Sequence, residues 1–142
     1  MTADAMRRLV VTHRYSASPE RVYDAWLDPG TAGRFLFATP GGVMKRVEID
    51  PRVGGDFVIV ERRGDADAEH YGRFLELDRP RRIVFRFGVT AYDVDGAVIS
   101  IDIVAVDGGC ELTLTHEVAA EWAERSLRGW TMILEGLATA LA

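Results

Sequence analysis

The C-terminal segment from Glu121 to Ala142 constrains the fold more than any other part of the chain. It contains no proline, and its apolar residues recur at the spacing of one face of an amphipathic helix: Leu127, Trp130, Leu134, Leu137 and Leu141. Gly129, Gly136 and Ala140 lie beside this stripe, so one flank of the apolar face is almost bare. Each glycine in a helix interior costs roughly 1 kcal/mol relative to alanine. Close packing against a neighbour is one reason to keep them, and room for a ligand is another.

The segment before this helix reads as short strands separated by turn residues. Alternating and β-branched residues predict strands at Arg7–Ser16, Met44–Ile49, Gly55–Glu61, His70–Asp78, Arg82–Val89, Val98–Val106 and Cys110–Val118. Asp107-Gly108-Gly109 is typical of a tight hairpin turn. The polar stretch Arg62–Glu69, which contains a glycine, is predicted to be a hairpin loop, and Asp93–Gly96 another turn.

Two short helices are expected after the first strand. Ser18 is a good N-cap and Pro19 suits the first helical position, so the first helix should run to about Leu27, where Asp28-Pro29-Gly30 ends it. Thr31–Phe37 forms a second short helix or turn in this interpretation. Six successive strands with short connections imply an antiparallel sheet. The long C-terminal helix is the element that can cover its apolar face, which makes the chain an α+β protein.

Length and charge narrow the class of protein. The chain has 142 residues, which suits a single domain over residues 1–142, and its net charge of −5 argues against nucleic acid as a partner. Because no window approaches the roughly 18 apolar residues of a membrane span, no membrane partner is expected. A lone cysteine, Cys110, excludes an internal disulfide framework, and no secretory signal precedes Val11. We therefore expect a cytoplasmic protein.

Motifs of known chemistry are absent from the sequence. The glycine pairs fit neither dinucleotide-binding nor phosphate-binding loops, and no nucleophile elbow occurs. His116-Glu117 begins like a zinc motif, but Ala120 stands where the second histidine must be. His13 and His70 lie on other predicted strands without acidic or cysteine neighbours at ligand spacing. No metal and no cofactor are therefore predicted.

A set of motifs over nearly the whole chain resembles a known family. They are the strand-to-helix entry Ala17–Trp26, the turn Asp50–Phe57 with its Arg-x-Gly-Gly core, Tyr71-Gly72 with Arg79-Pro80 and Arg82–Phe85, the closing strand Leu112–Glu117, and Gly129-Trp130 with Leu134 and Leu137. Together they resemble the SRPBCC superfamily (START-like, birch-pollen-allergen-like), in the branch named after the activator of the heat-shock-protein ATPase. One departure is that this branch often has tryptophan near Phe35, whereas Phe35 and Phe37 stand here.

The resemblance implies a helix-grip fold, in which a curved antiparallel sheet of about six or seven strands wraps around the C-terminal helix, with two short helices after the first strand. It also implies a cavity between sheet and helix that holds a hydrophobic small molecule. Buried aromatic residues form either plain core or the wall of that cavity. The candidate ligand-binding residues are Trp26, Phe35, Phe37, Phe57, Tyr71, Phe85, Phe87, His116, Trp130 and Leu134.

His116 is the residue whose role would distinguish a binding protein from an enzyme. It shares a strand face with Leu112 and Leu114, so it is either a satisfied core histidine or a group that awaits a ligand. If the protein is instead a cyclase-like or dehydratase-like enzyme, as some relatives are, His116 is a candidate general acid or base, with Tyr71 a weaker catalytic candidate. A third alternative is a chaperone partner that activates an ATPase. The sequence leaves open whether the protein is a homodimer.

Overall fold

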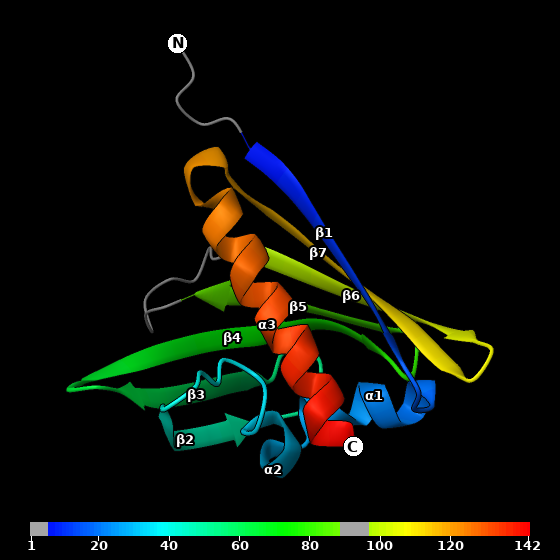
Figure 1. Cartoon of the computed structure of the whole chain (residues 1–142), viewed down its shortest axis with the longest axis horizontal. Helices are drawn as coiled ribbons and strands as arrows, with labels where there is room; N and C mark the ends of the chain where they lie inside the picture. Colours follow the sequence, from blue (N-terminus) through cyan, green and yellow to red (C-terminus); the bar gives the residue numbers. More distant parts are fainter. Residues whose placement is uncertain (1–5, 89–96) are drawn as a thin grey trace.

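The computed structural model describes residues 6–88 and 97–142, and in it one antiparallel sheet carries a long helix across its concave face (Figure 1). The expected turn at Asp93–Gly96 lies outside the described residues. The strands are β1 (Met6–Tyr15), β2 (Val43–Ile49), β3 (Asp56–Arg63), β4 (Ala66–Asp78), β5 (Arg82–Gly88), β6 (Ala97–Val106) and β7 (Gly109–Ala119). The helices are α1 (Pro19–Leu27), α2 (Pro29–Ala32), the short 3₁₀ turn η1 (Ala120–Trp122) and α3 (Ala123–Leu141).

The sheet confirms the predicted helix-grip architecture with seven strands. Their order is β1-β7-β6-β5-β4-β3-β2, and every neighbouring pair is antiparallel. Strands β2 to β7 therefore form a meander of consecutive strands, while β1 joins the far edge by pairing along its whole length with β7. This pairing brings the N-terminal strand alongside the C-terminal helix (Figure 1). None of the described helices is long and apolar enough to cross a membrane.

Each of the two short helices begins directly after an N-capping residue, Ser18 for α1 and Asp28 for α2. The Ser18 side chain accepts a hydrogen bond from the Arg21 N–H at 3.2 Å, and α1 ends at Leu27 as predicted. The second short helix or turn expected over Thr31–Phe37 is present but begins two residues earlier, because α2 starts at Pro29 and turn residues follow it as far as Phe37. Asp28 explains the shift, since its carboxylate accepts from the Thr31 N–H at 3.0 Å and thus caps a new helix directly after α1.

The hairpin between β3 and β4 is longer and tighter than the sequence predicted. The stretch Arg62–Glu69 is not a loop: β3 continues to Arg63, β4 begins at Ala66, and only two residues turn the chain. Gly64 takes a φ of +66°, the left-handed conformation that such a short hairpin favours at this position. The charged residues that suggested a loop instead extend the two strands beyond the core.

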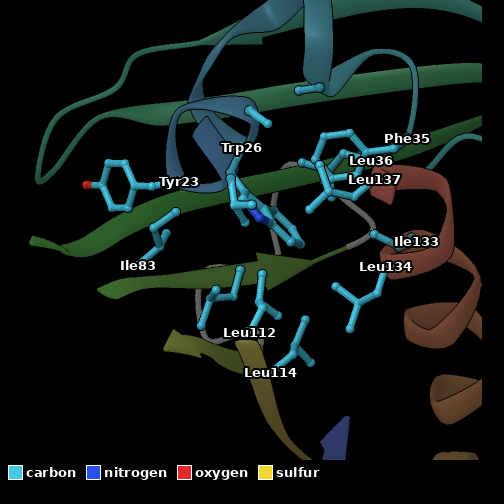
Figure 2. Packing of buried hydrophobic residues seen from close by; sticks show 14 of the residues in the cluster. Tyr23, Trp26, Phe35, Leu36, Ile83, Leu112, Leu114, Ile133, Leu134 and Leu137 are labelled. Atoms are coloured by element: carbon cyan, nitrogen blue, oxygen red, sulfur yellow. The ribbon is translucent and has the colours of Figure 1, made fainter. Parts of the chain in front are cut away.

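The core lies between the sheet, α1, α2 and the C-terminal half of α3. Trp130, Ile133, Leu134 and Leu137 are the buried residues of α3, whereas Leu127, expected on the same apolar face, is 41% exposed and lies outside the core cluster. Tyr15, at the end of β1, donates its hydroxyl hydrogen to the Leu134 carbonyl at 2.8 Å and so fixes the helix to the sheet. Figure 2 shows the packed cluster, with Trp26 of α1 among Leu112, Leu114 and Leu137.

Candidate functional site

A pocket of about 670 Å³ separates the N-terminal half of α3 from the sheet. We call it the α3 pocket. Its lining comes from the segment after α2 (Phe37, Ala38, Thr39), from the sheet (Arg63, His70, Phe87, Gly88, Ala97, His116, Val118), and from η1 and α3 (Trp122, Arg125, Ser126, Gly129, Trp130, Met132, Ile133). Trp122 and Met132 are also exposed, so the pocket reaches the surface beside them. Its volume lies within the range of roughly 300–1,000 Å³ that is usual for small-molecule sites.

The two glycines of α3 divide the helix into a packed half and an open half. A Cβ placed on Gly136 would lie 3.4 Å from the Phe35 Cβ, in ordinary van der Waals contact, so this glycine belongs to the packed core. A Cβ placed on Gly129 would meet no atom within 4 Å, and Gly129 lines the α3 pocket. The two glycines therefore lie in different surroundings, Gly136 against the core and Gly129 beside open space.

The structure brings four of the candidate ligand-binding residues together in the α3 pocket: Phe37, Phe87, His116 and Trp130. Three others, Trp26, Phe57 and Phe85, lie in the core around a void of only about 10 Å³. A void of this size is at the lower limit for one water molecule, and the residues around it are apolar apart from the Trp26 indole N–H. These three residues are therefore packed core and do not face the α3 pocket.

The remaining three candidates also lie elsewhere. Phe35 packs edge-on against Trp26 with ring centroids 5.1 Å apart, and Leu134 is fully buried in the core. Tyr71 is next to His70 on β4, and because successive side chains point to opposite faces of a strand, it lies on the outer face of the sheet. Its hydroxyl donates to Glu69. Tyr71 and His116 are thus on opposite sides of the sheet and do not form a catalytic pair.

Phe37 forms one wall of the α3 pocket in an unusual backbone conformation. Its φ is +58°, which is uncommon for a residue other than glycine and costs free energy that its surroundings must offset. The ring lies flat on the His70 imidazole, with centroids 4.1 Å apart and an interplanar angle of 3°, and it also stacks on Phe87 at 4.9 Å. These contacts hold the ring as a wall of the pocket.

A buried carboxylate fastens this wall to the sheet. Glu61 on β3 accepts hydrogen bonds from the Thr39 N–H at 2.8 Å, the Thr39 hydroxyl at 2.7 Å and the Arg63 Nε at 2.6 Å. Arg63 in turn donates from Nη2 to the Phe37 carbonyl at 3.1 Å. Burial alone would raise the pKa of Glu61, but the hydrogen bonds from Arg63 and Thr39 outweigh it and hold that pKa below its ordinary value. We call Glu61, Arg63 and Thr39 the Glu61 clamp.

His116 is buried against Trp130 of α3. The Trp130 Nε1–H donates to the His116 Nδ1 at 2.9 Å, and the two rings meet edge to face at 6.0 Å. Burial lowers the pKa of His116 from its ordinary value of 6.5, so the imidazole is neutral near pH 7. An indole N–H only donates, so Nδ1 carries no proton and the proton resides on Nε2. The sequence left open whether the strand face that carries His116 looks towards the helix, and the structure places it there.

His70 was not among the predicted ligand-binding residues, yet it lines the same pocket. His70 and Phe74 share the inner face of β4, because they are an even number of residues apart on the strand. This strand parity is the signal that could have identified His70. Its Nδ1 lies 3.2 Å from the Ile59 carbonyl, which only accepts, so this nitrogen carries the proton. Burial lowers the pKa of His70 more than the Ile59 hydrogen bond raises it.

Two neutral buried histidines make stability depend on pH. Because both pKa values fall below the ordinary 6.5, the unfolded chain binds more protons than the folded protein under mildly acidic conditions. The contribution of the two neutral histidines to the free energy of unfolding should be fully present above about pH 6.5. It should decrease as the pH falls towards the pKa values of the two histidines in the folded protein. Urea unfolding between about pH 7.5 and 5.5 measures this loss.

The matched variants are His70→Gln and His116→Gln, each of which should flatten the decrease with pH. His13→Gln is the control, because His13 lies on β1 outside the pocket, with its Nδ1 at 2.8 Å from the Arg14 carbonyl. An unchanged pH slope in the His70→Gln, His116→Gln double variant would contradict the assignment of two buried neutral histidines.

The charged residues of the α3 pocket are both arginines. Arg63 is engaged in the Glu61 clamp, and Arg125 lies over the Trp122 ring at 5.8 Å.

Within residues 6–88 and 97–142, no three His, Cys, Asp or Glu side chains gather closely enough to hold a metal ion. Cys110 is buried at the start of β7, and burial raises its thiol pKa, so it is not an activated nucleophile.

Comparisons with known proteins agree with this fold. The family model described as Activator of Hsp90 ATPase homolog 1-like protein matches residues 16–142. A structure from Chromobacterium violaceum is 27% identical with a TM-score of 0.80, covering 93% of this chain and 94% of that one. An Activator of Hsp90 ATPase homolog 1-like protein from Aeromonas hydrophila is 21% identical with a TM-score of 0.83, covering 95% and 92%. A Staphylococcus aureus protein of unknown function is 15% identical with a TM-score of 0.86, covering 96% and 94%. No curated protein matches the sequence significantly.

Proposed function

The chain belongs to the Activator of Hsp90 ATPase homolog 1-like family, and from that premise we propose that it binds a hydrophobic small molecule in the α3 pocket. The observation that carries the proposal is the pocket itself, about 670 Å³ in volume and walled by Phe37, Phe87 and Trp130. Aromatic and aliphatic walls with a few fixed polar groups are typical of small-molecule sites. The family resemblance implies the same class of ligand.

Gly129 supports the proposal independently of the pocket volume. The glycine weakens the helix by roughly 1 kcal/mol relative to alanine, and a Cβ at this position would contact nothing in the protein. Packing therefore does not require a glycine here. A ligand that lies against the helix backbone does require one, because any side chain would occupy its place.

Ligand binding should raise the melting temperature. A molecule that binds only the folded protein stabilises it by RT ln(1 + [L]/Kd), about 2.7 kcal/mol at a concentration 100 times Kd. Differential scanning fluorimetry with naphthalene and its apolar derivatives tests this expectation, and tryptophan fluorescence gives a second readout because Trp130 lines the pocket. Native mass spectrometry of the protein purified from cells would reveal a ligand retained from the cell.

The proposal fails if no apolar aromatic probe changes either the melting temperature or the tryptophan fluorescence, and if the purified protein carries no bound mass. Stimulation of a chaperone ATPase in the same preparation would favour instead the activity that gives the family its name. Catalysis is not proposed, since Tyr71 lies on the outer face of the sheet and His116 bonds with Trp130.

A further inference from the structure

The α3 pocket presents two histidine nitrogens of opposite hydrogen-bonding character. In His116 the Trp130 indole occupies Nδ1, so Nε2 carries the proton and is a donor. In His70 the Nδ1–H donates to the Ile59 carbonyl, so Nε2 has a lone pair and is an acceptor. The partner of each Nδ1 therefore fixes which tautomer the ring adopts.

Neither Nε2 has a partner among the described residues. The hydrogen bonds of His70 and His116 within residues 6–88 and 97–142 are those at Nδ1. Both residues line the α3 pocket, although both side chains are largely buried. A polar group in such a place costs free energy unless water or a ligand satisfies it.

An aromatic wall connects the two histidines. His70 stacks on Phe37, the Phe37 and Trp130 ring centroids lie 5.9 Å apart, and Trp130 meets His116 at 6.0 Å. Phe87 lies beside the same series, 6.2 Å from Trp130. Because the Phe37 and Trp130 rings are tilted by 58° to each other, an aromatic ligand can stack on one of them and meet the other edge to face, with one end directed to each imidazole.

We propose, resting on the proposed function, that the ligand is an elongated aromatic molecule with a hydrogen-bond acceptor at one end and a donor at the other. The acceptor, such as a ketone oxygen, accepts a hydrogen bond from the His116 Nε2–H. The donor, such as a phenolic hydroxyl, bonds to the His70 Nε2. Because both imidazoles are neutral, the geometry selects uncharged polar groups at these two positions.

A series of four naphthalene probes tests the proposal by calorimetry or tryptophan fluorescence. The probes are naphthalene, acetylnaphthalene, naphthol, and a naphthalene with acetyl and hydroxyl groups at opposite ends. Each neutral hydrogen bond should tighten binding by about three- to tenfold, so the doubly substituted probe should bind tighter than either singly substituted one. His116→Leu should abolish the gain from the acetyl group, and His70→Leu the gain from the hydroxyl group.

Two further measurements keep the proposal testable if a leucine variant misfolds. His116→Gln supplies both a donor for the ligand and an acceptor for Trp130, so it should restore part of the acetyl gain. Nitrogen NMR of the wild-type imidazoles should show the proton on Nε2 of His116 and on Nδ1 of His70, with no variant needed. The same tautomer in both rings would overturn the proposal.

The outcomes separate this proposal from the function on which it rests. If no probe binds, naphthalene included, the binding function fails. If all four probes bind equally, the pocket is apolar only and the histidine pair does not select the ligand. Naphthoate serves as a fifth, anionic probe. If it binds tighter than the doubly substituted probe, Arg63 or Arg125 recognises an anion, and the proposal that the histidines select uncharged groups is wrong.

Discussion

Replacing Glu61 by alanine is expected to lower the free energy of unfolding by about 3 kcal/mol. The Glu61 carboxylate is almost completely buried and accepts three hydrogen bonds from Thr39 and Arg63. Removing one partner of a buried charged network leaves the others unsatisfied, which costs more than the network contributes net. Arg63 is 40% exposed and can return to water, but the Thr39 N–H cannot be satisfied as easily. Urea unfolding at neutral pH measures the loss.

A matched control is available on the neighbouring strand. Glu48 on β2 pairs with Arg46, but its side chain is 60% exposed, so Glu48→Ala should leave stability unchanged within error. Gly42→Ala should reproduce part of the Glu61 effect, because a Cβ at Gly42 would collide with the Glu61 carboxylate. Equal stability of Glu61→Ala and Glu48→Ala would show that the clamp contributes nothing beyond a surface ion pair.

Glu61→Ala should also weaken binding of the naphthalene probes. Arg63, freed from Glu61, no longer has a fixed position from which to hold the Phe37 carbonyl, and Phe37 keeps its φ of +58° only while its surroundings enforce it. Relaxation of this backbone would remove the ring from its stack on His70. The Glu61 clamp thus links the stability of β3 to the shape of the pocket.

The fold was predictable because its signals are local. The 2-residue and 3.6-residue periods of strands and helices, the Ser18 cap and the Asp107-Gly108-Gly109 turn each act over a few residues, and they placed seven strands and the helix α3 correctly. The wrong loop at Arg62–Glu69 and the unexpectedly early start of α2 have one cause. Polar residues can extend a strand or cap a new helix as readily as they can form a loop, and the choice depends on contacts outside the local sequence.

The pocket was only partly predictable because its shape depends on distant contacts. Strand parity put Phe85 and Phe87 on one face of their strand, but it could not distinguish Phe85, which packs into the core, from Phe87, which lines the pocket. The difference arises because α1 and α2 fill one end of the sheet and not the other (Figure 1). The tautomers of the two histidines likewise depend on partners that only the folded chain brings near: Trp130 and Ile59.

Replacing Gly129 by phenylalanine is expected to weaken binding of the naphthalene probes by at least about 100-fold while preserving the fold. Gly129 lines the pocket, and a Cβ there meets no atom within 4 Å, so the new ring can enter the open space without displacing core side chains. Phenylalanine is also a better helix former than glycine, by a few tenths of a kcal/mol. Melting temperature and probe titration together should therefore show a protein that is at least as stable and has lost its ligand.

The alanine variants of the two helix glycines separate an occupied pocket from a general effect on α3. Gly129→Ala should raise the free energy of unfolding by up to about 1 kcal/mol, since it removes the cost of glycine and meets no neighbour. Gly136→Ala should stabilise to a similar degree, because its Cβ would be in ordinary van der Waals contact with Phe35, and it should leave probe affinity unchanged because Gly136 lies outside the pocket. If Gly129→Phe still binds naphthalene as tightly as the wild type does, the ligand does not lie against α3. The glycine would then have to be explained by something other than a bound molecule.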